Sequence, residues 1–133
     1  MDIFLSNKLY CKKSNIPGAG YGVFTKEDIK KGEVIEVSRF IKIDLDLYDY
    51  LNKDIINILY NFPKKMPKFF SIVFGYGSLY NSSLDNITNN VDWITDEEND
   101  VFIYSSVVDI KKDSELYIYY NNQEFNDIKK QQT

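Results

Sequence analysis

Residues 18–24 read Gly-Ala-Gly-Tyr-Gly-Val-Phe, and this stretch restricts the fold more than any other part of the chain. Glycine at every second position removes three Cβ atoms, which permits positive φ angles and lets backbone N–H and C=O groups approach a ligand closely. The same spacing suits a tight turn between two strands, so the pattern by itself leaves both interpretations open. It is not a dinucleotide-binding fingerprint, because the spacing is G-x-G-x-G and a strand follows where a helix is required.

Short predicted strands surround this loop. Alternating and β-branched runs predict strands over residues 3–10, 21–25, 33–37, 87–95, 101–108 and 115–120, and residues 69–74 form a short apolar run. The strands over 87–95 and 101–108 are predicted to form a hairpin whose connection, residues 96–100, is an acidic turn. From Leu45 to Phe62, in contrast, apolar residues recur every three or four positions, which predicts one helix capped by Asp44 or Asp46 and ended by Pro63. The sum is a β-rich domain with one helix and many turns.

Composition excludes several classes of protein. The length of 133 residues fits a single domain over 1–133. The chain has no histidine, which removes histidine relays and ligands, and its single cysteine, Cys11, cannot build a disulfide or a cysteine zinc cluster, so no metal site is predicted. A net charge of −4 with one arginine argues against binding nucleic acid directly.

Targeting signals are also missing from the sequence. Residues 1–13 lack the features of a signal peptide, and no apolar run reaches the length of a membrane span. We therefore expect a soluble intracellular protein, cytoplasmic or nuclear and not secreted, with no membrane partner.

Two further motifs accompany the glycine loop. Residues 75–83 read Gly-Tyr-Gly-Ser-Leu-Tyr-Asn-Ser-Ser, and residues 109–116 read Asp-Ile-Lys-Lys-Asp-Ser-Glu-Leu with Tyr120 at the end. In this order, and with Ile-Lys-Lys-Gly-Glu-Val-Ile at 29–35, they resemble the SET domain of protein lysine methyltransferases. The family patterns are GxGxGVF with I-x-K-G-E, then NHSxxPN, then D-I-x-x-G-E-E-L-x-x-x-Y. The resemblance spans about residues 8–120, and the compact length resembles small viral and bacterial members.

The fold that the resemblance implies is mainly β. It consists of several small curved sheets, one or two helices and a pseudoknot-like crossing of the C-terminal segment, which Asn86 would help to hold. Residues 121–133 would form a polar tail of the same single SET-type domain.

The resemblance also implies S-adenosylmethionine as methyl donor, without a metal. The glycine loop would hold the methionine end of the donor, the Asn81 amide its amino group, and Ser82 would meet the adenine. Tyr120 and Tyr60 are the implied catalytic residues, with Tyr120 beside the transferred methyl and Tyr60 in the lysine channel. The implied cofactor-binding residues are Gly18, Ala19, Gly20, Tyr21, Asn81, Ser82, Tyr120 and Phe125.

Without the resemblance, each of these residues has a plainer interpretation. Asn81 would stabilise a turn, Tyr120 is one of eleven tyrosines, Tyr60 would lie on one helix face, and Phe125 would belong to a frayed tail. The sequence also departs from the family patterns in three places: Ser82 replaces His, Asp85 replaces Pro and Asp113 replaces Gly. A catalytically degenerate SET fold used as a binding module, or an unrelated β-rich interaction domain, therefore remain alternatives.

The implied reaction is attack of a lysine amine on a sulfonium methyl group. A free lysine with a pKa of about 10.4 is neutral only about 0.04% of the time at pH 7, so the site must favour the uncharged amine. Burial in an aromatic channel beside a cation does so by desolvation and like-charge repulsion, whereas a resting tyrosine is a weak base. The implied partner is a lysine-containing protein or peptide, a histone being the first candidate, and analogy with compact members makes a homodimer an option.

Overall fold

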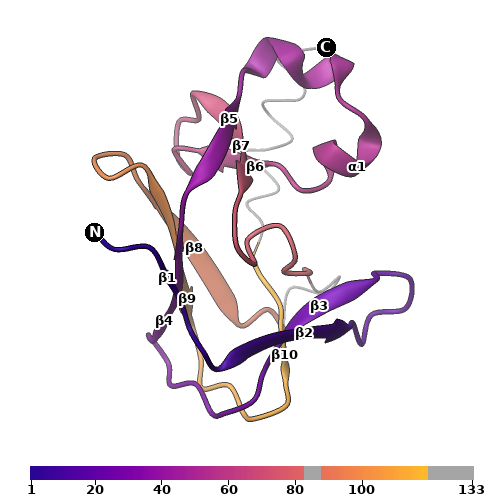
Figure 1. The fold of residues 1–133 in the computed structure, drawn as a ribbon, viewed down its shortest axis with the longest axis vertical. Coiled ribbons are helices and arrows are strands. Elements are labelled where there is room, and N and C mark those ends of the chain that lie inside the picture. The colour runs from indigo at the N-terminus through magenta and orange to yellow at the C-terminus, as the bar shows by residue number, and fades with distance from the viewer. Residues whose placement is uncertain (83–87, 120–133) are drawn as a thin grey trace.

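The computed structural model of the chain describes residues 1–82 and 88–119, and within them the fold consists of three small antiparallel sheets (Figure 1). The first sheet has the order β1 (Phe4–Leu5), β4 (Val34–Ser38), β9 (Val101–Ser106), β8 (Val91–Asp96). The second has the order β10 (Glu115–Leu116), β3 (Tyr21–Thr25), β2 (Leu9–Lys13). The third has the order β5 (Phe40–Ile43), β7 (Phe69–Val73), β6 (Tyr60–Phe62). The prediction of a mainly β fold with several small sheets is confirmed.

The second sheet joins the first and third sequence motifs. β3 begins directly after the glycine loop and is the middle strand, with β2 on one side and β10 on the other. In the β10–β3 register, Glu115 pairs with Phe24 and Leu116 pairs with Val23. Residues more than ninety positions apart in the sequence are therefore direct neighbours at the lower end of the molecule in Figure 1.

The segment after β10 pairs with two other parts of the chain at once. Tyr117 forms a parallel bridge with Asn81, and Ile118 forms a parallel bridge with Val91 at the start of β8. The Ile118 amide donates to the Asn81 carbonyl at 2.8 Å, and the Val91 amide donates to the Tyr117 carbonyl at 3.0 Å. These bridges form the C-terminal crossing that the family resemblance implied.

An aromatic core fills the space between the first and third sheets. Tyr60 of β6 packs edge-on against Trp93 of β8 and against Phe102 of β9, with ring centroids 5.0 and 5.4 Å apart. All three side chains are at least 98% buried. Edge-to-face packing of this kind adds to the free energy gained from apolar burial.

The single helix predicted over residues 45–62 is wrong. The structure has a 3₁₀ helix η1 (Leu45–Tyr50), a one-turn helix α1 (Lys53–Ile56) and then strand β6. The interruption lies at Leu51 and Asn52, whose backbones are extended, and the Asn52 side chain accepts a hydrogen bond from the Ile55 amide. Asparagine favours this capping role over a helix interior, so it divides an apolar pattern that is otherwise helical.

Smaller differences concern the strand ends. The first predicted strand is two strands, β1 and β2, separated by a turn, and β5 was not predicted. β3 has the predicted bounds, and β8 and β9 form the predicted hairpin around the acidic turn. Among the described residues, no helix is both long enough and apolar enough to span a membrane.

Candidate functional site

The glycine loop between β2 and β3 uses its glycines in two different ways. Gly18 and Gly20 have φ angles of +79° and +73°, a region that other L-residues adopt only with strain, and a Cβ at either position would contact nothing. Gly22 lies in β3, where a Cβ would collide with the Glu115 carboxylate and lie 3.1 Å from Asn81 Nδ2. The first two glycines therefore shape the loop, and the third makes room for the side chains beside it.

Glu115 is the centre of the hydrogen bonds around this loop. Its side chain is almost fully buried. Oε2 accepts hydrogen bonds from the Ser14 hydroxyl at 2.7 Å and from Asn81 Nδ2 at 3.3 Å. Oε1 accepts from the Asn15 backbone amide at 2.8 Å and from the Tyr117 hydroxyl at 3.1 Å. One carboxylate thus connects the base of the glycine loop to Asn81.

The hydrogen bonds of Asn81 fix the orientation of its amide. Nδ2 donates to the Tyr21 carbonyl at 3.1 Å and to the Glu115 carboxylate at 3.3 Å, so both amide protons are used. Because Nδ2 faces two acceptors, the assignment of nitrogen and oxygen is unambiguous. Oδ1 accepts no hydrogen bond from any residue in 1–82 or 88–119. A half-buried carbonyl oxygen in this position suits a ligand ammonium group.

The structure brings together most of the predicted cofactor-binding residues that it describes. Asn81 contacts the carbonyl of Tyr21 at the end of the loop that contains Gly18, Ala19 and Gly20. The Tyr21 side chain itself is 67% exposed. Ser82 follows Asn81 directly and is half-buried.

Tyr60 lies in a different setting from the one that a helix face would give it. It is in β6 and fully buried, and its hydroxyl donates to the Gly77 carbonyl at 2.8 Å. Gly77 lies in the turn that runs from β7 to Asn81, so this hydrogen bond connects Tyr60 to the second motif.

Several predicted residues fall outside the described part of the chain, which excludes 83–87 and 120–133. They are Tyr120, Phe125, Asp85 and Asn86.

Tyr76, in the second motif, is described and half-buried. Desolvation raises the pKa of its hydroxyl, and so does the neighbouring Cys11. The pKa of the Cys11 thiol is raised in turn, chiefly by its own burial.

Glu115 is the residue of this candidate site to which the sequence alone assigns no role. It belongs to the third motif only as a position of the family pattern. The available signal is a carboxylate next to Leu116 in a predicted strand, where burial requires hydrogen-bonded partners. Those partners lie up to 101 positions away, so the sequence does not identify them.

In chemical terms, the site combines a loop of accessible backbone with a fixed amide oxygen. Backbone N–H and C=O groups near Gly18 and Gly20 can meet the polar ends of a small ligand, and Asn81 Oδ1 can accept from an ammonium group. These are the groups that the amino-acid end of a ligand requires.

Comparison with known proteins identifies the family of this arrangement. A family model described as the SET domain matches residues 20–121. A search of curated proteins found no match.

Solved structures share the fold. A candidate histone methyltransferase of Plasmodium falciparum superimposes with a TM-score of 0.67 at 29% identity, covering 88% of this chain and 96% of that chain. A chain of Chaetomium thermophilum Polycomb Repressive Complex 2, autoinhibited and bound to S-adenosylmethionine, gives a TM-score of 0.67 at 17% identity over 92% of this chain and 16% of that chain. A humanized mutant of that complex bound to an inhibitor gives 0.65 at 20% identity, with 86% and 15% covered. The two Polycomb comparisons show a shared fold.

Proposed function

This chain belongs to the SET domain family, and from that premise we propose that it is a protein-lysine N-methyltransferase that uses S-adenosylmethionine. The single observation that carries the proposal is the fixed amide of Asn81 beside the glycine loop, whose oxygen accepts from none of the described residues, 1–82 and 88–119, and can accept from a ligand. A structural neighbour described as bound to S-adenosylmethionine supports the choice of donor.

The residues of the site fit this donor. Backbone groups of Gly18–Tyr21 would hold the carboxylate end, and Asn81 Oδ1 would accept from its ammonium group. Ser82 would lie by the adenine, and Phe125, with Tyr120, would complete the binding site. When bound, the donor supplies a methyl group activated by a sulfonium centre.

The lysine must arrive uncharged. Tyr60 would line its path together with buried aromatic neighbours, since desolvation by such surfaces lowers the pKa of an amine. Tyr120 would pack by the methyl group and align it with the amine, which supplies orientation in place of strong base catalysis. The substrate would be a lysine-containing protein, and a histone is the first candidate because of the Plasmodium falciparum neighbour.

The test measures donor binding and methyl transfer separately. Titration calorimetry with S-adenosylmethionine comes first, followed by incubation with isotopically labelled donor and mixed histones, read by mass spectrometry. We expect Tyr120→Phe to lower turnover by about a hundredfold, because alignment is lost, while donor affinity changes by less than about twofold. Tyr50→Phe is the matched control, because Tyr50 is 85% exposed in η1.

Each result has a distinct meaning. Methyl transfer by the unaltered protein supports the proposal, and equal turnover in Tyr120→Phe contradicts the role of that tyrosine. Donor binding without transfer to any protein would favour a degenerate SET fold that acts as a binding module, for which the replacements at Ser82 and Asp113 argue.

A further inference from the structure

A second buried carboxylate lies in the first sheet, away from the glycine loop. Glu36 of β4 is fully buried, yet both of its oxygens accept hydrogen bonds. Oε1 accepts from the Tyr80 hydroxyl at 2.6 Å, and Oε2 accepts from the Ser38 hydroxyl at 2.5 Å and the Tyr76 backbone amide at 2.9 Å. The ion pairs found within residues 1–82 and 88–119 do not include Glu36. A buried carboxylate without a cation is costly, so stability alone gives little reason for it.

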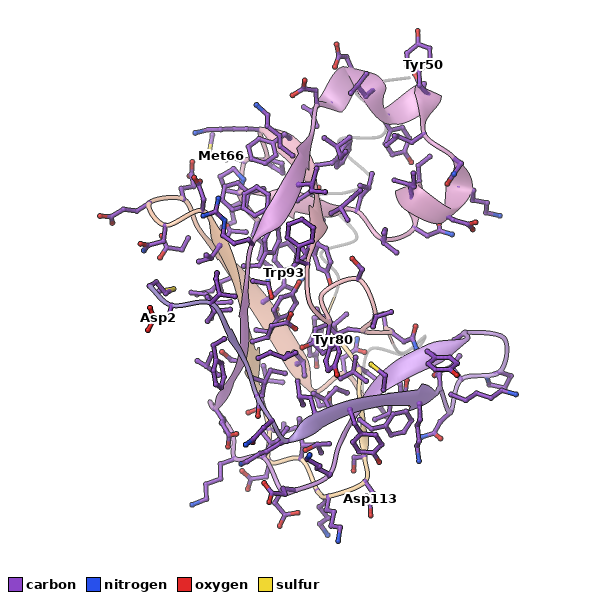
Figure 2. The ribbon with its side chains drawn as sticks, viewed as in Figure 1. Asp2, Tyr50, Met66, Tyr80, Trp93 and Asp113 are labelled. Atoms are coloured by element: carbon purple, nitrogen blue, oxygen red, sulfur yellow. The ribbon has the colours of Figure 1, made fainter. Side chains whose placement is uncertain are left out.

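Two of the three donors belong to one turn. This turn, residues 75–80, connects β7 to Asn81, and Glu36 binds it near its start through Tyr76 and at its end through Tyr80. Gly75 opens the turn with a φ of +68°, and a Cβ there would collide with Oε2 of Glu36. Figure 2 shows Tyr80 near the middle of the molecule.

The same turn connects the two halves of the proposed active site. Its Gly77 carbonyl accepts the hydrogen bond of the Tyr60 hydroxyl, and its last residue, Tyr80, precedes Asn81. Any shift of the turn would therefore move the Gly77 carbonyl relative to Tyr60 and the Asn81 amide relative to the glycine loop. A displacement of about 1 Å in such a site is enough to lower a reaction rate about a hundredfold.

We propose that Glu36 is a positioning residue for methyl transfer: it anchors the 75–80 turn to β4, so that Asn81 and the Tyr60–Gly77 pair keep the relative placement that the reaction requires. This inference rests on the proposed function. Glu36 would contact neither donor nor lysine, and its effect would pass through Tyr76 and Tyr80.

The chain offers a matched pair of variants. Tyr80→Phe and Ser38→Ala each remove one hydroxyl that donates to Glu36, but only Tyr80 lies in the turn. Ser38 is in β4 itself, so its loss leaves the turn attached through both remaining hydrogen bonds. A merely structural role for Glu36 predicts that the two variants behave alike once their stabilities are matched.

Amide hydrogen exchange on the ligand-free chain of 133 residues reports the anchoring directly. The reporters are the amides of Tyr76, Leu79 and Ile118, which donate to Glu36, to the Tyr76 carbonyl and to the Asn81 carbonyl respectively. We expect exchange to accelerate about tenfold in Tyr80→Phe, the factor implied by loss of one hydrogen bond to a charged group, and less than about twofold in Ser38→Ala.

Titration with S-adenosylmethionine is run on the same samples, with an expected rise of about tenfold in Kd for Tyr80→Phe alone. Glu36→Gln is the conservative rescue, because its amide oxygen can accept from Tyr76 while its NH₂ group donates to the Tyr80 hydroxyl. It should keep exchange and Kd within about twofold of the unaltered protein, whereas Glu36→Ala should not.

The outcomes separate the two proposals. Equal exchange in Tyr80→Phe and Ser38→Ala overturns the anchoring by Glu36, whether or not the protein binds the donor. Faster exchange with an unchanged Kd and turnover overturns the positioning role and leaves a structural one. If the two variants show the exchange difference but the unaltered protein binds no S-adenosylmethionine, the proposed function fails, and a role in methyl transfer fails with it.

Discussion

The Nδ2 atom of Asn81 lies 3.3 Å from the Glu115 carboxylate, although 34 positions separate the two residues. The same carboxylate accepts from Ser14 and Asn15 at the base of the glycine loop, so one buried side chain holds loop and amide together. Asn81 is thereby oriented before any ligand arrives. Pre-orientation of this kind reduces the cost of ordering the site when a ligand binds.

Glu115→Gln should weaken both the fold and donor binding. Each carboxylate oxygen of Glu115 accepts from an N–H group. On one side it is the Asn15 backbone amide, which can only donate, and on the other it is Nδ2 of Asn81, which can turn away only by losing its hydrogen bond to the Tyr21 carbonyl. The glutamine NH₂ group must face one of them, which should lower the free energy of unfolding by about 1–3 kcal/mol in urea titrations. Donor Kd should rise about tenfold by calorimetry, since Asn81 loses its fixed orientation.

Glu97→Gln is the matched control for this change. Glu97 forms an exposed ion pair with Lys68, and such pairs contribute at most about 1 kcal/mol. Similar losses in the two variants would show that Glu115 has no special role.

Asn81→Asp should lower the free energy of unfolding and weaken donor binding at neutral pH, because Tyr21 and Glu115 no longer hold the side chain in its orientation. The substitution keeps the shape of the side chain but places an oxygen where Nδ2 now meets the Tyr21 carbonyl and the Glu115 carboxylate. Repulsion and two lost hydrogen bonds should reduce the free energy of unfolding by about 1–3 kcal/mol. Urea unfolding and calorimetry measure the two effects; Asn7→Asp, at an exposed position, should change neither, and donor binding by Asn81→Asp at unaltered affinity would refute the assigned role.

A comparison of Gly22→Ala with Gly32→Ala should distinguish the effect of steric crowding from the effect of backbone strain. At Gly22 the new Cβ would collide with Glu115 and crowd Asn81, an overpacking that costs about 1–3 kcal/mol. Gly32 has a φ of +86° and open space around it, so alanine there costs about 1–2 kcal/mol through strain alone. Both variants should unfold at lower urea concentration, but only Gly22→Ala should lose donor affinity. Equal donor affinity in the two would show that the space beside Gly22 does not matter to the site.

Short sequence patterns correctly predicted those strands and turns that depend mainly on residues close together in the chain. β3 has its predicted bounds, and the β8–β9 hairpin forms around the acidic turn, because alternation and turn residues suffice there. The glycine loop does join two strands, as one of its two interpretations required. Its ligand role could be predicted only from the resemblance.

The parts of the fold and of the candidate site that the sequence did not predict depend on contacts between residues far apart in the chain. The apolar spacing over 45–62 is helical, yet Leu59 and Phe62 are buried beside β7 partners that no local pattern indicates. Glu36 and Glu115 are likewise ordinary in sequence, and their donors lie up to 44 and 101 positions away. Buried carboxylates of this kind are defined by tertiary structure, so a single sequence does not reveal them.

Asp113→Gly should stabilise the protein. Asp113 has a φ of +70° in the turn closed by the hydrogen bond from the Ser114 amide to the Lys111 carbonyl, at the lower end of the molecule in Figure 2. The strain of a left-handed residue, about 1–2 kcal/mol, is partly offset by the greater freedom of an unfolded chain with one more glycine, about 0.4–1 kcal/mol. A net gain of about 0.5 kcal/mol should appear in urea unfolding. A loss of stability would mean that Asp113 makes a favourable contact that outweighs its strain.

Glu36 should make stability depend on pH in a direction opposite to that of most carboxylates. Burial raises the pKa of this carboxyl above its ordinary value, although hydrogen bonds from Ser38, Tyr80 and the Tyr76 amide partly oppose the rise. The folded state therefore binds the proton more tightly than the unfolded state does, and the resulting stability is present at low pH. It is lost as pH rises through the folded-state pKa, and the loss is about 1.4 kcal/mol for every tenfold difference in proton affinity between the folded and unfolded states.

Urea unfolding of the unaltered protein and of Glu36→Gln between pH 4 and 8 measures this effect, because other titrating groups are common to both chains and cancel. The stability of the unaltered protein relative to the variant should be greatest at pH 4, fall as Glu36 ionises, and level off above its pKa. Carbon-13 NMR of the Glu36 carboxyl should show a pKa above the ordinary value of a glutamate. A stability difference that stays constant across the range would show that Glu36 titrates as an ordinary glutamate, and its burial would then need another explanation.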